Sequence, residues 1–305
     1  MIMQNKTVRN KYIQHSMFRM ESYGSLFVVS TPIGNLEDIT IRAINVLKEV
    51  DYILCEDTRV SLKLLNKYSI KTKLIAYHRN NEINQLENIL LDLKSGKNIA
   101  LISDAGTPLI SDPGSILLSS ISQNNLKAFS VPGPSALTAA LSLCPFFKNE
   151  FLFVGFLPEQ KSKRIDLISK MFARSVLVVL YIAPHDFRKY LIEIQSFYPS
   201  IKVFYAREIT KAYEDVWYGE INRLIETLGQ KKIKGEIVLC LDFKRDNIKQ
   251  IDMTNTELFI AINDYINKGF SLKEASRQCS KEFGLSSKKL YKLYLEQKKS
   301  LIIPL

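Results

Sequence analysis

Short apolar runs alternate with amphipathic stretches along the first half of the chain. Five of these runs have the length and composition of buried strands, and they lie at residues 26–30, 52–55, 74–77, 99–103 and 128–131. In the stretches that follow them, apolar residues recur every three to four positions, the spacing of a helix with one buried face. These stretches are residues 38–50, 58–68, 82–95, 116–122 and 135–143, with Asp38 and Asp57 as N-cap candidates. The alternation predicts a parallel sheet with helices on both faces.

A second alternation begins near residue 151. It predicts strands at 151–155, 176–182, 201–206 and 236–242, a further candidate strand at 215–219, and helices at 163–173, 186–197 and 220–228. The pattern then changes to helical stretches at 256–267, 271–283 and 286–297, the last two with Ser271 and Ser286 as candidate caps. The sequence therefore predicts an α/β protein of four parts: a flexible extension (1–24), two α/β domains (25–146 and 147–246) and a basic helical segment (250–305).

The composition is that of a globular protein. Hydrophobic residues make up 46% of the 305 positions and charged residues 24%, and the mean hydropathy is −0.03. These values exclude a disordered chain and a membrane bundle. The four cysteines are far apart and form no C-x-x-C pair, so we predict no metal and a reduced, cytoplasmic protein.

The charge balance is strongly basic. Lysine and arginine number 42 against 31 aspartates and glutamates, which gives a net charge of +11. A surplus of this size favours a polyanionic partner such as nucleic acid. A lysine-rich genomic bias explains it equally well, because Lys, Asn and Ile are all frequent. The net charge alone does not decide between a polyanionic partner and a genomic bias.

Three loops rich in Gly, Pro and small polar residues follow predicted strands, at residues 31–35, 103–108 and 132–136. In open α/β sheets, ligands bind at the carboxyl ends of strands, and glycine lets a backbone approach a ligand closely. None of the loops carries G-x-G-x-x-G or a Walker phosphate loop, which disfavours a pyrophosphate-cradling cofactor. Composition alone favours ordinary strand-to-helix turns over a defined cofactor site.

Ionisable side chains follow the second and third predicted strands. Glu56, Asp57 and Arg59 could serve proton transfer, substrate anchoring or helix capping, and Asp57 fits a cap at least as well as a catalyst. His78 and Glu82 follow the next strand, where a lone histidine is more often a surface residue than a catalyst. No Ser-His-Asp elbow or H-E-x-x-H pattern is present in the sequence.

Seven motifs, in order along the chain, resemble those of the bacterial small-subunit ribosomal RNA cytidine 2′-O-methyltransferases. These enzymes belong to the tetrapyrrole-methylase-like, or class III, group that uses S-adenosylmethionine (SAM). The motifs lie at residues 31–40, 56–59, 103–114, 132–136, 155–158, 206–211 and 234–236. The sequence departs from the family pattern at Ile182, where the family usually has a glutamate after the tyrosine.

The resemblance implies two α/β domains of the tetrapyrrole-methylase type with the active-site cleft between them, plus a small helical C-terminal segment. It implies SAM as cofactor. The residues expected to bind it are Ile33, Asp104, Gly106, Thr107, Pro108, Ile110, Gly133, Ser135, Ala136, Ala183 and Ala206.

The implied reaction is 2′-O-methylation of a ribose, in the family cytidine 1402 of 16S ribosomal RNA, in naked RNA or an assembled 30S subunit. A homodimer and no membrane partner are also expected. The hydroxyl must lose its proton as it attacks, and a carboxylate or histidine could accept that proton; the candidates are Glu56, Asp57, Glu82 and His78. Candidates for gripping RNA are Arg59, Arg207, Lys211, Lys288, Lys289 and Lys292.

Two other functions stay open. One is methylation of a corrin or another tetrapyrrole precursor, which the basic charge and basic tail argue against. The other is a non-catalytic RNA-binding protein of ribosome assembly, which the intact loops at all three cofactor positions argue against. The basic tail itself could track RNA or form a solvated helical cap.

Overall fold

The computed structural model describes residues 23–147, 149–171, 176–229, 233–243, 255–283 and 286–300. Of the predicted extension 1–24, only the last two residues lie within this part. The chain divides into two compact units. Among the described residues, the first unit consists of those up to Cys144 together with Tyr205–Trp217 and Gly235–Val238, and the remaining described segments form the second.

The first sheet has five strands, all in the first unit. Its order is β3-β2-β4-β1-β5, and every neighbouring pair is parallel, as the alternation predicted. The strands are β1 (Ser25–Val29), β2 (Tyr52–Cys55), β3 (Lys73–Ala76), β4 (Ile99–Leu101) and β5 (Lys127–Val131). The helices between and after them are α1 (Ile41–Glu49), α2 (Thr58–Lys67), α3 (Glu82–Lys94), α4 (Ser115–Gln123) and α5 (Ala136–Leu143).

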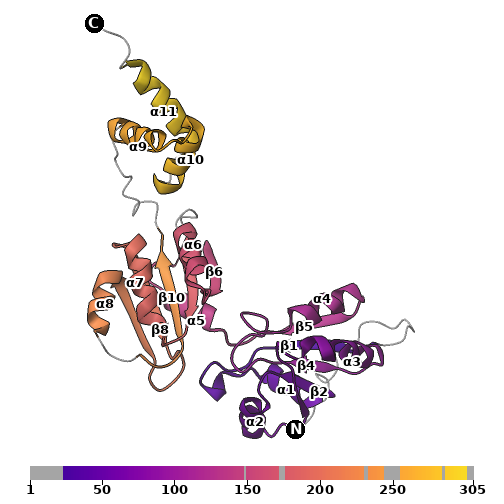
Figure 1. Ribbon diagram of the computed structural model, residues 1–305. Coiled ribbons are helices and arrows are strands. Elements are labelled where there is room, and N and C mark those ends of the chain that lie inside the picture. The colour runs from indigo at the N-terminus through magenta and orange to yellow at the C-terminus, as the bar shows by residue number, and fades with distance from the viewer. Residues whose placement is uncertain are drawn as a thin grey trace, which may run out of the picture. The chain divides into compact units, whose positions relative to one another are not determined.

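Each face of this sheet has its own apolar core. Along β2, alternate side chains point to opposite faces. Ile53 and Cys55 therefore join a cluster with α1 and α2, whereas Tyr52 and Leu54 join a cluster with α3 and α4. All four β2 residues are buried, which explains why a central parallel strand appears in the sequence as an unbroken apolar run. Helices cover both faces (Figure 1).

The helix starts confirm one cap prediction and correct another. Asp57 caps α2, because its Oδ1 accepts a hydrogen bond from the Arg59 amide at 2.8 Å. Asp38 is not the cap of α1. It ends a short 3-10 helix, η1 (Leu36–Asp38), and the cap is Thr40, whose Oγ1 accepts from the Ala43 amide at 3.1 Å.

The second sheet has the order β6-β7-β10-β8-β9. Its strands are β6 (Phe151–Phe156), β7 (Leu177–Ile182), β8 (Lys202–Arg207), β9 (Asp215–Glu220) and β10 (Ile237–Asp242). The helices are α6 (Lys161–Met171), α7 (Phe187–Phe197) and α8 (Ile221–Leu228). Arg164 of α6, which is 1% exposed, donates bidentately to Glu193 of α7 and to the carbonyls of Pro158 and Glu159. The ion pair of Arg164 and Glu193 therefore holds the loop that follows β6, through the two carbonyls that Arg164 binds.

Three helices, α9 (Asn255–Asn267), α10 (Leu272–Phe283) and α11 (Ser287–Ser300), pack on one another around a shared apolar cluster (Figure 1). Ser271 caps α10 as predicted: its hydroxyl accepts from the Glu274 amide, while the Glu274 carboxylate accepts from the Ser271 amide. Within the described ranges, no helix has the length and apolarity needed to cross a bilayer.

Candidate functional site

The loops that follow the strands of the first sheet meet at one edge, because all five strands run in the same direction. Thr31, just after β1, exchanges two backbone hydrogen bonds with Gly106, after β4, at 2.9 and 3.0 Å. The hydroxyls of Ser30 and Thr107 lie 2.9 Å apart, and the Thr107 hydroxyl donates to the Pro134 carbonyl at 3.2 Å. The three Gly/Pro-rich loops predicted from the sequence thus form one bonded assembly.

Gly106 is the residue on which this assembly depends most closely. Its φ is +82°, a left-handed conformation that glycine adopts without the steric cost of a side chain. A Cβ at this position would lie 3.3 Å from Ile33 Cγ2. Glycine therefore allows the loop after β4 to pack against the loop after β1.

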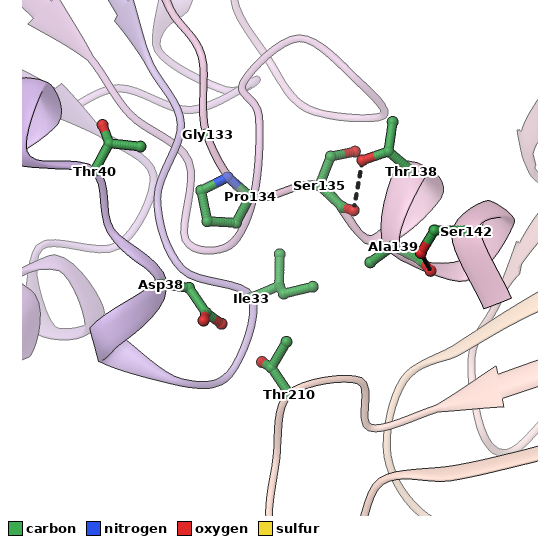
Figure 2. Close-up of a pocket in the computed structure, with 10 residues that line it drawn as sticks. All are labelled: Ile33, Asp38, Thr40, Gly133, Pro134, Ser135, Thr138, Ala139, Ser142 and Thr210. Atoms are coloured by element: carbon green, nitrogen blue, oxygen red, sulfur yellow. Dashed lines mark hydrogen bonds between the residues drawn. The ribbon is translucent and has the colours of Figure 1, made fainter.

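A pocket of about 450 Å³ opens beside these loops (Figure 2). Pockets of this size accept a small organic ligand. Its wall combines small side chains, several hydroxyls and one carboxylate. The lining residues are Ile33, Asp38, Thr40, Gly133, Pro134, Ser135, Thr138, Ala139, Ser142 and Thr210.

The predicted cofactor residues fall into three groups. Ile33, Gly133 and Ser135 line the pocket. Gly106 and Thr107 hold the neighbouring loops together, with Pro108 and Ile110 in the same loop and Ala136 at the start of α5. Asp104 has a different contact: it accepts from the Asp57 amide at 3.0 Å and so joins the loops after β4 and β2.

Two predicted cofactor residues lie outside the first sheet and its loops. Ala206 is fully buried in β8, and Ala183 follows β7. Neither residue is among those that line the pocket in the described part of the chain. Their roles stay predictions.

The structure separates the four candidate proton acceptors by what their side chains already bind. Asp57 is committed to Arg59, with contacts of 2.6 to 3.2 Å, and these hydrogen bonds lower the pKa of its carboxyl to about 2. Glu82 accepts from the Gly114 amide at 3.3 Å. His78 has a buried Nδ1 without a hydrogen-bond partner among the described residues. Glu56 is half-buried directly after β2, and no described residue donates a hydrogen bond to its carboxylate.

Asp112 is a residue of the site that the sequence did not single out. Burial, together with the negative charges of Glu56 and Asp104, raises the pKa of its carboxyl to about 6, although Ser103 and Arg79 partly oppose this. The three carboxylates come from two different loops, so only the folded chain brings them together. The sequence pattern therefore could not predict that these three carboxylates lie close together.

Asp112 gives the protein a specific pH dependence. A carboxyl whose pKa is raised on folding stabilises the fold fully below its ordinary pKa of 3.8, and that contribution is lost as the pH rises through about 6. Asp112→Asn removes the ionisation. Between pH 4 and 7 we expect its free energy of unfolding to rise relative to wild type by about 1–3 kcal/mol. Urea unfolding at several pH values measures this.

Asp92→Asn provides the control, because the pKa of Asp92 is shifted in the other direction. Burial raises this pKa, but hydrogen bonds from Lys97 and Tyr52 outweigh burial and lower it. Its contribution is complete above the ordinary pKa of 3.8 and is lost only at lower pH, so the cost of its replacement should stay nearly constant between pH 4 and 7. The same trend for both variants would contradict the assignment of the raised pKa to Asp112.

The predicted RNA contacts differ in availability. Arg59 is largely exposed but paired with Asp57, and Arg207 lies 3.6 Å from Asp215. Lys211 is paired with two carboxylates and only 30% of its side chain is exposed. On α11, by contrast, Lys288, Lys289 and Lys292 are exposed, although Lys292 lies 3.7 Å from Glu296.

Several pocket residues were absent from the predicted site. Asp38, Thr40 and Thr210 belong to motifs that the sequence offered, but their chemistry gave no reason to select them. Thr138, Ala139 and Ser142 show a helical spacing on α5 that periodicity could have identified as one face. In the described part of the chain, no group of three His, Cys, Asp or Glu side chains is placed to hold a metal ion.

Comparison with known proteins identifies the family. The family model of tetrapyrrole (corrin/porphyrin) methylases matches residues 25–225, more than half of the chain. The chain therefore belongs to the tetrapyrrole methylase family and is a methyltransferase.

Two solved structures share the fold. Uroporphyrin III C-methyl transferase from Thermus thermophilus superposes with a TM-score of 0.53 at 17% identity, over 72% of this chain and 98% of that one. Cobalt precorrin-4 methyltransferase gives 0.54 at 14% identity, over 74% and 98%. Both matches confirm the predicted α/β fold class.

Closer in sequence are proteins named ribosomal RNA small subunit methyltransferase I. The protein from Halalkalibacterium halodurans is 34% identical over 93% of this chain and 99% of its own length. The one from Thermotoga maritima is 42% identical over 72% of this chain and 99% of its own length. These relatives confirm the resemblance that the seven motifs indicated.

Proposed function

We propose that the chain is a SAM-dependent methyltransferase that modifies a ribose 2′-hydroxyl of small-subunit ribosomal RNA, with cytidine 1402 of 16S RNA as the expected site. The observation that carries this proposal is the identity of 34% to the Halalkalibacterium halodurans protein across 99% of that protein's length. The net charge of +11 supports an RNA substrate over a small tetrapyrrole.

The pocket suits the proposed cofactor. SAM combines a cationic sulfur, a ribose with two hydroxyls and a flat base. The pocket offers the Asp38 carboxylate for a positive charge, hydroxyls such as Thr40 and Ser135 for hydrogen bonds, and the apolar face of Ile33 for packing. Backbone groups of the loops around Gly133 are within the same wall. We expect these residues to bind SAM.

When bound, SAM supplies a methyl group that its sulfonium already activates. The chain's own residues then have two tasks: to hold the acceptor hydroxyl in line and to accept its proton. Glu56 is the proposed proton acceptor, because its carboxylate is half-buried and is not committed to another group among the described residues. Asp57 is a poorer choice, since its bonds to Arg59 stabilise the ionised form.

A methyl-transfer assay tests the proposal. Radiolabelled SAM is supplied with 30S subunits, naked 16S RNA or uroporphyrinogen III, and the modified nucleotide is located by its resistance to alkaline cleavage. We expect label in RNA as a 2′-O-methyl group. Label in the tetrapyrrole alone would favour the corrin-type alternative, and RNA binding without any transfer would favour a non-catalytic assembly protein.

The C-terminal helices are proposed to strengthen RNA binding. The apolar cluster of α9–α11 draws its described members from these three helices, so the helices do not depend on the α/β sheets for their core. Deletion of residues 250–305 should weaken RNA binding by about 10-fold or more at matched salt while leaving the SAM dissociation constant unchanged. Fluorescence anisotropy with labelled RNA and calorimetry with SAM measure the two constants.

A triple variant checks that prediction without removing the helices. Replacement of Lys288, Lys289 and Lys292 by glutamine should reduce the slope of log K against log salt by about 2, because each phosphate contact on single-stranded RNA contributes about 0.7. An unchanged slope and unchanged affinity would exclude these lysines as RNA contacts.

The remaining expectations are part of the same proposal. A homodimer is expected from the resemblance. A reduced, cytoplasmic location fits the four cysteines, which are buried and not joined in disulfides. The division into domains at residues 25–146, 147–246 and 250–305 is proposed on the sequence pattern.

A further inference from the structure

The turn that follows β8, residues 208–211, has an unusual backbone. Glu208 and Thr210 have φ values of +53° and +69°, which are left-handed conformations of non-glycine residues. Such residues persist only where their surroundings hold them. Here the Glu208 amide donates to the Glu236 carbonyl at 3.0 Å, and the Thr210 amide donates to the Glu214 carboxylate at 2.6 Å.

Lys211 ties the same turn to a second segment. Its Nζ lies 2.8 Å from Glu208 Oε1 and 3.2 Å from Glu236 Oε2, and Glu208 Oε1 also accepts from the Glu236 amide at 3.0 Å. Gly235, with φ +86°, leaves the space that the Glu208 side chain fills. The ammonium is therefore part of a built network rather than a cation held out toward solvent.

The 208–211 turn contacts the loop after β1. The Thr210 hydroxyl accepts a hydrogen bond from the Asn35 amide at 3.1 Å. A Cβ on Gly34 would overlap the Lys211 stem and lie 2.9 Å from Thr210 Oγ1, so the two segments are packed backbone to side chain. Ile33, one residue earlier, lines the pocket together with Thr210 (Figure 2).

We propose that Thr210 and Lys211 are positioning residues: they fix the loop of residues 32–35, and through it Ile33, at the wall of the pocket. Lys211 thus acts on the pocket through Gly34 and does not grip RNA phosphates. This inference rests on the proposed function for its ligand, SAM. It replaces the RNA-binding role that sequence reasoning gave to Lys211.

A matched pair of variants tests the Thr210 contact. Thr210→Val keeps the shape and removes the acceptor for the Asn35 amide, whereas Thr210→Ser keeps the acceptor. We expect Thr210→Val to raise the SAM dissociation constant and to speed hydrogen exchange of the Asn35 amide, each by about 3- to 10-fold, as the loss of one hydrogen bond predicts. Thr210→Ser should stay near wild type in both measurements.

Lys211→Met tests the second residue, with Lys170→Met as a control lysine that is also ion-paired but lies on α6. The expected result is a higher SAM dissociation constant for Lys211→Met alone, with an unchanged salt dependence of RNA binding. A phosphate contact would instead lower the salt slope by about 0.7–0.9. That lower slope, with SAM binding unchanged, would overturn the inference.

The two proposals fail in distinguishable ways. If the wild-type protein bound no SAM, the proposed function would be wrong. The exchange rate of the Asn35 amide and the salt slope would still decide whether residues 208–211 hold the loop. Wild-type exchange and wild-type SAM binding in Thr210→Val would overturn the positioning role alone.

Discussion

Gly106→Val is expected to raise the dissociation constant for SAM by about 100-fold or more, because one substitution disturbs two contacts of the pocket wall. The valine side chain would need space where a Cβ alone already lies 3.3 Å from Ile33 Cγ2 and 3.8 Å from the Pro134 oxygen. It would also force a β-branched residue into φ +82°, against the paired hydrogen bonds with Thr31. Isothermal titration calorimetry measures the effect.

Gly96→Val is the matched control for this prediction. Gly96 also has a positive φ, +94°, but it lies in the turn between α3 and β4, at the opposite end of the strands from the pocket loops. Both variants should lose stability for the same conformational reason, and thermal unfolding measures that loss. Equal SAM affinity in the two variants would mean that the loop after β4 does not shape the cofactor site.

Glu56→Gln is expected to lower the rate of methyl transfer by about 10²–10⁴-fold, the range for loss of a general base. Glutamine keeps the size and polarity of the side chain but accepts no proton at neutral pH. The SAM dissociation constant should not change, since Glu56 does not line the pocket. Single-turnover transfer of labelled methyl to 30S subunits isolates the chemical step from product release.

Asp57→Asn separates proton transfer from structure at the neighbouring position. Asparagine keeps the oxygen that caps α2 but weakens the pairing with Arg59, so it should reduce stability, and its rate should fall by less than about 10-fold. A near-normal rate in Glu56→Gln would mean that another group accepts the proton, and a larger loss in Asp57→Asn would indicate Asp57. If neither variant lost rate, His78 and Glu82 would be tested next.

Much of the fold follows from local patterns. The buried strand at Tyr52–Cys55 is an uninterrupted apolar run, and α2 has both a regular apolar spacing and a capping Asp57, so both were predicted at nearly their observed bounds. The start of α1 was wrong by three residues because two polar residues, Asp38 and Thr40, both suit a cap. Only the short 3-10 helix η1 distinguishes the two candidates, and the spacing of apolar residues does not show where it forms.

The site was predictable only as far as it consists of strand-end loops. Ile33, Gly133 and Ser135 follow strands directly, so the parallel topology brings them to one edge. Thr210 comes from a segment more than 170 positions away and reaches the pocket through tertiary packing. The raised pKa of Asp112 likewise depends on carboxylates of different loops, and no single stretch of sequence contains that information.

The three C-terminal helices have a consequence for how such enzymes diversify. A bundle whose apolar cluster is drawn from residues 258–294 can be acquired, exchanged or lost without opening a cavity in either sheet. The Thermotoga maritima relative matches over 99% of its own length but over only 72% of this chain, so it is the shorter protein. RNA affinity, which we propose these helices provide, can then change without any alteration of the proposed methyl-transfer chemistry.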